Sequence, residues 1–136
     1  MKVVLPEGWP RPRGYSNGIL ARGQVLAIAG LIGWDEREKL VSPQFAPQFR
    51  QAVDNIAAVL RAAGAGPEHL ISVTIYVTDK REYGHHLAQV GAVYREVMGK
   101  HYPAMALVQV ADLLLPGAKV EIQGLAVLPP ASEPAP

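Results

Sequence analysis

The segment LISVTIYVT, residues 70–78, constrains the fold more than any other stretch of the chain, because apolar and polar side chains alternate along it without a break. Successive side chains of a strand point to opposite faces of the sheet. One face would carry Ile71, Val73, Ile75 and Val77, and the other would carry Ser72, Thr74, Tyr76 and Thr78. The pattern therefore predicts a strand with two chemically different faces, of which one packs on a core.

Two helices are predicted on either side of this strand. The first runs from Pro47 or earlier to Ala63, ahead of a C-terminal glycine, and its apolar side chains recur at helical spacing: Phe45, Phe49, Val53, Ile56, Val59, Leu60 and Ala63. The second begins at Asp79, which has capping-box spacing to Glu82, and ends at Gly99. Its apolar stripe consists of Tyr83, Leu87, Val90, Tyr94 and Val97.

Residues 24–32, QVLAIAGLI, predict another strand, and residues 102–128 predict two more around a Pro-Gly turn. If the last two strands form a hairpin in which Ala111 pairs with Lys119, Gln109 lies opposite Glu121 and Met105 opposite Leu125. The carboxylate of Glu121 is then best interpreted as lying on the solvated face of its strand. The alternative is a carboxylate at a subunit interface, where it would need partners or a raised pKa.

The order strand, helix, strand, helix, strand, strand predicts an α+β fold, in which helices cover one face of a mixed sheet. The uncovered face would carry Thr74, Tyr76 and residues of the last two strands, and small domains usually bury such a face against copies of themselves. We therefore expect a homo-oligomer of one domain, residues 1–128. Residues 1–18 would form an irregular arm, and the Pro-rich tail 129–136 would be disordered.

Composition excludes several classes of function. With 13 Lys and Arg against 12 Asp and Glu, the chain lacks the basic surface of a nucleic-acid binder. It contains no cysteine, which excludes disulfides and thiol nucleophiles and is compatible with the cytoplasm. No apolar stretch is long enough to span a membrane. The adjacent His85 and His86 point about 100° apart on a helix, so we predict no metal site and interpret them as a solvated helix start.

The central chain resembles the RidA family, also called YjgF-like or L-PSP. The resemblance covers roughly residues 13–128. It rests on GYSNGI, AGLIGWD, FRQAVDNIAAVLRAAGAGPEHLISVTIYVTD, VYREVMGKHYPA and, most specifically, LPGAKVEIQGLAV. It implies a chorismate-mutase-like two-layer sandwich, a homotrimer with small-molecule clefts between subunits, and no cofactor. The better studied members of the family hydrolyse enamines and imines to 2-oxo acids and ammonia.

The resemblance also implies site residues. The cleft tyrosine of the family matches Tyr15, and the carboxylate thought to place the attacking water matches Glu121. The substrate-anchoring arginine is replaced by Met105, so we interpret the chain as a branch without that arginine. A serine and an asparagine of the family are replaced by Ala29 and Gly91. Gly30 and Leu107 complete the predicted substrate-binding positions.

These departures leave three functions open. The first is an enamine or imine deaminase of altered specificity, for which small 2-imino acids would be poor substrates. In such a deaminase, Arg13, Arg22 or His101 would bind the substrate anion in place of the family's arginine. The second is a non-catalytic trimer that binds a small molecule or regulates. The third, an RNA-cleaving translation inhibitor, has the least support, because the charge is near neutral and no histidine pair is placed for acid–base cleavage of RNA.

Overall fold

The computed structural model describes residues 1–130 and contains two sheets and three α-helices in that range. The predicted disorder of the tail falls, from residue 131 onward, outside the described residues. In chain order the elements are β1 (Lys2–Val4), β2 (Gly18–Leu20), β3 (Gln24–Ile32), α1 (Phe45–Ala62), the 3-10 turn η1 (Pro67–His69), β4 (Leu70–Val77), α2 (Lys80–His85), α3 (Leu87–Met98), β5 (Ala104–Gln109) and β6 (Val120–Leu128).

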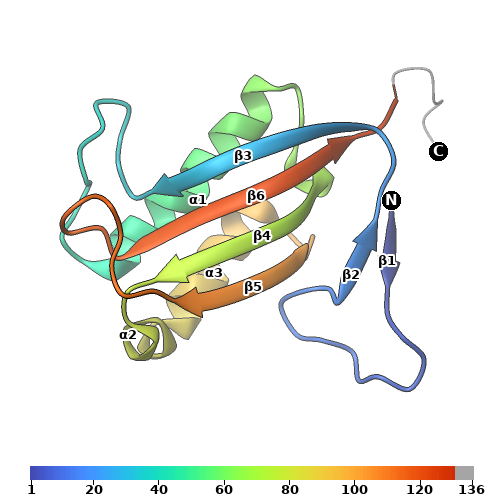
Figure 1. Ribbon diagram of the computed structural model, residues 1–136, viewed down its shortest axis with the longest axis horizontal. Coiled ribbons are helices and arrows are strands. Elements are labelled where there is room, and N and C mark those ends of the chain that lie inside the picture. The colour runs from blue at the N-terminus through green and yellow to red at the C-terminus, as the bar shows by residue number, and fades with distance from the viewer. Residues whose placement is uncertain (131–136) are drawn as a thin grey trace.

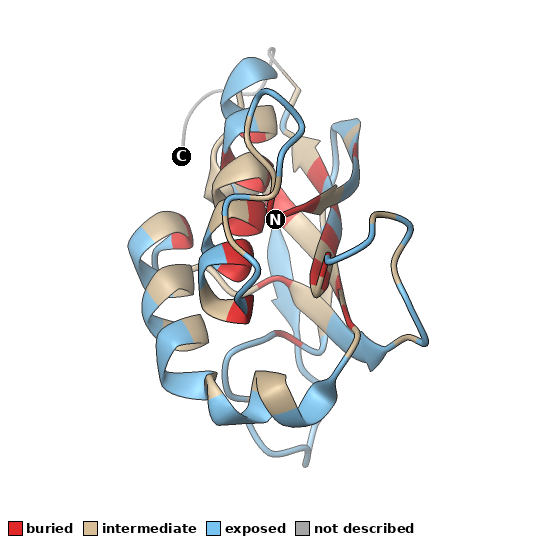
Figure 2. Cartoon of the chain, turned by 90° about the vertical axis from the view of Figure 1, so that its left-hand side faces the viewer, coloured by how far each residue is buried: buried red, intermediate tan, exposed pale blue. Residues whose placement is uncertain are grey.

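The main sheet has the strand order β3-β6-β4-β5, with the helices on one of its faces (Figure 1). β6 is antiparallel to both of its neighbours, β3 and β4, whereas β4 and β5 are parallel and are joined through α2 and α3. Figure 2 shows the two layers edge-on, with the buried residues gathered between them. The predicted two-layer α+β sandwich with a mixed sheet is confirmed.

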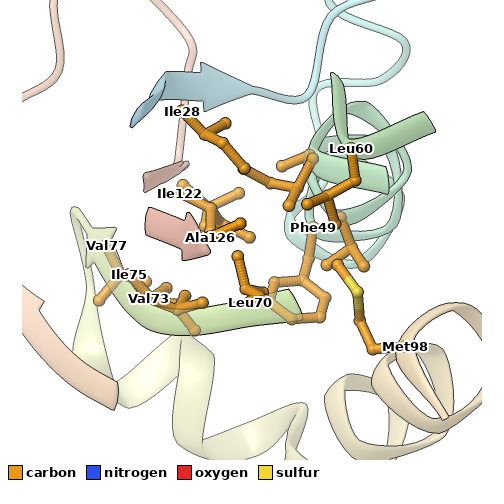
Figure 3. Close-up of a cluster of buried hydrophobic side chains, with 14 of the residues drawn as sticks. Ile28, Phe49, Leu60, Leu70, Val73, Ile75, Val77, Met98, Ile122 and Ala126 are labelled. Carbon is orange, nitrogen blue, oxygen red and sulfur yellow. The ribbon is translucent and has the colours of Figure 1, made fainter. Parts of the chain in front are cut away.

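The core lies between α1 and the sheet (Figure 3). Phe49 and Leu60 of α1 pack there against Val73 and Ile75 of β4 and Ile122 of β6. The helix is amphipathic because its apolar residues recur every three to four positions, which is the stripe that the sequence predicts. Ala63 is the exception: it follows the last turn of α1 and is exposed.

Three local predictions are wrong. The last two strands do not pair with each other, because β4 lies between them. Ile71 is only partly buried: the register shifts between Leu70 and Ser72, and Leu70 takes the core position instead. The second helix is not continuous: α2 ends at His85 and α3 begins at Leu87, so the histidine pair lies at the junction, with His86 as the N-cap of α3.

The beginning of that helical region is partly as predicted. Asp79 caps α2, since its carboxylate accepts hydrogen bonds from the backbone N–H groups of Arg81 and Glu82. The side chain of Glu82 does not complete the capping box but forms an ion pair with Lys119, 3.1 Å away. This ion pair ties α2 to the residue that precedes β6.

The N-terminal arm is more regular than predicted. β1 and β2 form a separate two-stranded antiparallel sheet to one side of the main sheet (Figure 1). Ser16, in the loop between them, donates its hydroxyl hydrogen to the Tyr102 carbonyl and its backbone N–H to the Pro103 carbonyl. These two bonds fix the loop beside the start of β5.

Candidate functional site

Glu121 lies on the face of the sheet that no helix covers. Its chain neighbours Val120 and Ile122 are buried on the helix side, so the alternation of the strand turns Glu121 the other way. Its partners across the sheet are Tyr76 of β4 and Ile32 of β3, not Gln109 as the predicted hairpin required. Neither partner is a cation, which explains why the strands beside Glu121 offer it no charge to pair with.

The carboxylate of Glu121 lies directly over Gly30. A Cβ atom placed on Gly30 would stand 2.5 Å from Oε2 of Glu121, so the carboxylate occupies the space that a larger residue would fill. Gly30 lies in an irregular part of β3, where the pairing register shifts between Ile28 and Leu31. Within residues 1–130 the Glu121 side chain makes no hydrogen bond or ion pair. Its oxygens are therefore available to a ligand or a water molecule.

Tyr15 is positioned by the loop that Ser16 fixes. Gly14 precedes it with a φ of 77°, a left-handed conformation that side chains other than glycine rarely adopt. Tyr15 follows with 41% of its surface exposed, and its ring lines a pocket of about 400 Å³ between the loop, α2, α3 and β5. The same pocket is lined by Gly91 of α3 and by Met105 of β5.

The predicted site residues therefore fall into two groups on opposite faces of the sheet. Met105 is in register with Val73, and Leu107 with Ile75, so both point to the helix side, although Leu107 lies outside the pocket lining and is 39% exposed. Glu121 and Gly30, over which its carboxylate lies, are on the other side of the sheet. Ala29, which precedes Gly30 in the sequence, is exposed. A site that used both groups would have to be assembled from two copies of the chain.

The sheet face that no helix covers has a surface suited to such an assembly. Val25 of β3 is 65% exposed, and Leu125 of β6 and Val108 of β5 are each 40% exposed. β5 forms an edge of the sheet, and beyond Ala104, which bridges to Ser16, its outer side has no partner strand among residues 1–130. Exposed apolar side chains and an open edge both favour association with another chain.

Tyr94 and Tyr102 stack at one side of the pocket, with ring centroids 5.8 Å apart. The hydroxyl of Tyr94 donates a hydrogen bond of 2.8 Å to the carbonyl of His101. Burial, together with the neighbouring Tyr102 phenol, raises the pKa of Tyr94 well above its usual value of 10.0. Burial also raises the pKa of Tyr83, another lining residue. Both phenols are therefore neutral hydrogen-bonding groups at neutral pH.

Of the three replacement anchors that the sequence suggested, only Arg13 lines the pocket. His101 faces an adjacent pocket of about 540 Å³, and its Nε2 donates to the carbonyl of Leu70. Arg22 lies in the turn before β3 and is not part of the lining. A fourth cation, Arg95 of α3, does line the pocket, and sequence reasoning missed it.

Sequence reasoning also missed Gln48, which is fully buried in α1. Its amide nitrogen donates to the carbonyls of Ser42 and Gly117, and its amide oxygen accepts from the backbone N–H of Lys119. These bonds hold the segment that leads into β6 and hence the strand that carries Glu121. The signal was present, because position 48 falls between Phe45 and Ala52 on the buried stripe of the helix.

Comparison with known proteins places this geometry in a family. A family model described as endoribonuclease L-PSP matches residues 10–128. The chain belongs to this family, which includes the Rid and YjgF proteins. It is 37% identical over 114 residues to a RutC family protein of Pyrococcus horikoshii, a match that covers 82% of this chain and 86% of the relative.

Other relatives carry a functional name. The human 2-iminobutanoate/2-iminopropanoate deaminase is 30% identical over 117 residues, which cover 85% of this chain and 81% of the relative. Among solved structures, a Rid family protein of Yersinia pestis superposes with a TM-score of 0.82 at 28% identity and covers 93% of this chain and 98% of that one. The predicted family and fold are thereby confirmed.

Residues 1–130 lack two other features that would point to a different class of protein. No group of three or more His, Cys, Asp or Glu side chains is arranged to hold a metal ion there. Nor does that part of the chain contain a helix with the length and apolar character needed to cross a membrane.

Proposed function

We propose that this protein hydrolyses enamines or imines derived from amino acids, in clefts formed between the copies of a homotrimer. One cleft would combine the pocket of one copy, which carries Tyr15 and Met105, with the Glu121 face of its neighbour. The deaminase relatives at about 30% identity support this reaction class. A closed ring of three is the simplest symmetry in which each copy offers both faces to different neighbours.

The observation that carries the proposal is the free carboxylate of Glu121 over Gly30. A general base must be within hydrogen-bond reach of the proton that it takes, which here is a proton of a water molecule. Within residues 1–130, no other group competes for the Glu121 carboxylate, and the missing side chain of Gly30 leaves space for its oxygens.

The chemistry follows from these positions. The substrate reacts as its protonated imine. Glu121 takes a proton from a water molecule as the water oxygen bonds to the carbon of the protonated imine and the C=N π electrons move to nitrogen, which yields a neutral carbinolamine. It then delivers this proton to the nitrogen and takes up the hydroxyl proton as the C–N bond breaks. Ammonia leaves, the 2-oxo acid remains, and Glu121 returns its proton to solvent. Water is the only co-reactant. Tyr15 donates a hydrogen bond to the substrate, and Met105 contacts its apolar side chain.

The test is the hydrolysis of imines generated in solution by an amino-acid oxidase. The rate of release of 2-oxo acid is compared between the wild-type protein and Glu121→Gln, with alanine, leucine and phenylalanine as oxidase substrates. Loss of a positioned general base lowers the rate about 10²–10⁴-fold. Glu36→Gln, which removes an equal charge from an exposed loop, is the control and should retain full activity. An unchanged rate in Glu121→Gln would refute the proposal.

A second candidate, a trimer that binds a small molecule without turning it over, is favoured by the composition of the pocket. Met105 and Gly91 give it an apolar wall and no side-chain hydrogen-bonding group at these two positions. If this candidate is correct, Glu121→Gln changes the dissociation constant of a bound ligand while the wild-type protein releases no 2-oxo acid above the uncatalysed rate.

A further inference from the structure

The pocket that contains Tyr15 and Met105 is positively charged and aromatic. Among residues 1–130, its two charged lining residues are Arg13 and Arg95, and no acidic side chain of that range lines it. The remaining lining consists of tyrosines and apolar groups: Gly14, Tyr15, Phe49, Ile75, Tyr83, Leu87, Val90, Gly91, Tyr94, Tyr102 and Met105. A pocket of this composition attracts a ligand that has one anionic end and an apolar body.

Arg95 reaches this pocket because position 91 is a glycine. The two residues lie one helical turn apart on α3, and long helical side chains point back toward the preceding turn. A Cβ atom on Gly91 would stand only 3.2 Å from Nη1 of Arg95, so the guanidinium lies over the space that a side chain at position 91 would occupy. Gly91 therefore provides room for a cation, in addition to lacking a hydrogen-bonding group.

The guanidinium of Arg95 is available for a ligand. Arg95 is exposed, and its side chain makes no hydrogen bond or ion pair within residues 1–130. The adjacent Glu96 does not compete, because its carboxylate is bound by both terminal nitrogens of Arg50, at 2.8 and 2.9 Å. Arg95 thus keeps its planar set of donors, which matches the two oxygens of a carboxylate.

We propose that Arg95 is the anion anchor of this pocket and that its ligand is a 2-oxo or 2-imino carboxylate with an apolar side chain larger than ethyl. The carboxylate binds the guanidinium over Gly91, and the apolar side chain packs against Met105, Phe49 and Val90. The volume of about 400 Å³ leaves room for such a side chain beside the carboxylate. This inference rests on the proposed function for the identity of the reacting group, but the binding of the carboxylate can be tested without any turnover.

The probe is 4-methyl-2-oxopentanoate, the product expected from the imine of leucine. The chain has three methionines, and Met105 is the one that lines this pocket. With 13C-methyl methionine, the Met105 signal reports binding while Met1 serves as a reference. We expect a saturable shift with 4-methyl-2-oxopentanoate, a weaker response to pyruvate, and almost none with the uncharged 4-methyl-2-pentanone.

Two variants remove the anchor in different ways. Arg95→Gln deletes the charge, and Gly91→Asn fills the space through which the guanidinium reaches the pocket. Each should weaken the binding of 4-methyl-2-oxopentanoate by about tenfold or more, as expected for a lost hydrogen bond to a charged group. The matched controls are Arg61→Gln, an exposed arginine of α1, and Gly84→Asn, a helical glycine with open space around it. Both controls should bind the probe as the wild-type protein does.

The inference is overturned if Arg95→Gln binds the probe as tightly as Arg61→Gln does, or if the wild-type protein shows no carboxylate-dependent shift at Met105. These outcomes are distinct from failure of the proposed function. If the wild-type protein binds the probe through Arg95 but does not hydrolyse imines, the hydrolase is refuted and the anchor stands. If imines are hydrolysed and Arg95→Gln leaves KM unchanged, the anchor is refuted and the hydrolase stands.

Discussion

Gly30→Ala should strongly lower the rate of imine hydrolysis while leaving the fold intact. The added Cβ atom would stand 2.5 Å from Oε2 of Glu121 and 2.8 Å from its Cδ, whereas ordinary contacts begin at 3.4 Å. The carboxylate oxygen must therefore move by about 0.9 Å. A displacement of this size at a reacting group can lower a rate by about 10²-fold. The stability cost is small, because the atoms that must move belong to the end of a flexible side chain.

The assay measures the rate of 2-oxo acid release and the free energy of unfolding for the same preparation of Gly30→Ala. We expect a rate about 10²-fold lower and an unfolding free energy within about 1 kcal/mol of the wild type. A rate equal to that of the wild type would refute the reasoning, since it would show that the position of the Glu121 carboxylate does not matter. A matched loss of stability would show that Gly30 serves the fold.

Gly33→Ala provides the contrast. A Cβ atom on Gly33 would stand 2.5 Å from the Cα of Gln48 and 2.6 Å from its carbonyl oxygen, so the backbone of α1 would have to move. Such overpacking typically costs about 1–3 kcal/mol. We therefore expect Gly33→Ala to lower the unfolding free energy, as measured by urea denaturation. Equal stability of the Gly30 and Gly33 variants would contradict the distinction between the two positions.

Two further predictions concern stability and its dependence on pH. Tyr94→Phe should lose about 1 kcal/mol at neutral pH with the hydrogen bond to His101. Burial raises the pKa of Tyr94, so the stabilising effect of its neutral form is present below pH 10 and is lost at higher pH. Tyr94→Phe has no phenol to ionise. Its unfolding free energy should therefore fall less than that of the wild type in alkaline denaturation. The hydrogen bond and charge of Arg50 lower the pKa of Glu96, so this carboxylate contributes to stability above pH 4.5, and the contribution is lost as the pH falls. Glu96→Gln should therefore be slightly less stable than the wild type at pH 7 and equally stable in acid. Thermal denaturation at low salt measures the difference.

The sequence predicts those parts of the fold that depend on local pattern. The strand 24–32 has the predicted bounds, and the first helix differs from its predicted start by two residues. The pairing of the last two strands was wrong because neighbours in sequence were assumed to be neighbours in the sheet, which holds for only about two-thirds of consecutive strands. Periodicity carries no information on whether β4 or β5 lies beside β6.

The candidate site, like the fold, could be predicted from the sequence only in part. Glu121 and Tyr15 were singled out by residue type and by resemblance, but their separation depends on tertiary structure. Glu121 points away from the helices because its neighbours Val120 and Ile122 enter the core, whereas Tyr15 is placed at the pocket by the loop that Ser16 fixes. Arg95 was missed because its role depends on the direction of a long side chain. Gly91 was interpreted as the loss of a polar group, whereas the structure shows that its missing Cβ leaves space for the guanidinium.

The most direct test of the central claim is complementation between subunits. Glu121→Gln and Tyr15→Phe damage different halves of the proposed cleft. If each cleft takes Tyr15 from one copy and Glu121 from the next, equal mixing of the two variants during refolding restores about a quarter of the clefts. We predict that the mixture hydrolyses the imine of leucine several-fold faster than either variant alone. A mixture no more active than the average of the two variants, although mixed oligomers are demonstrated by native mass spectrometry, would contradict a site shared between copies.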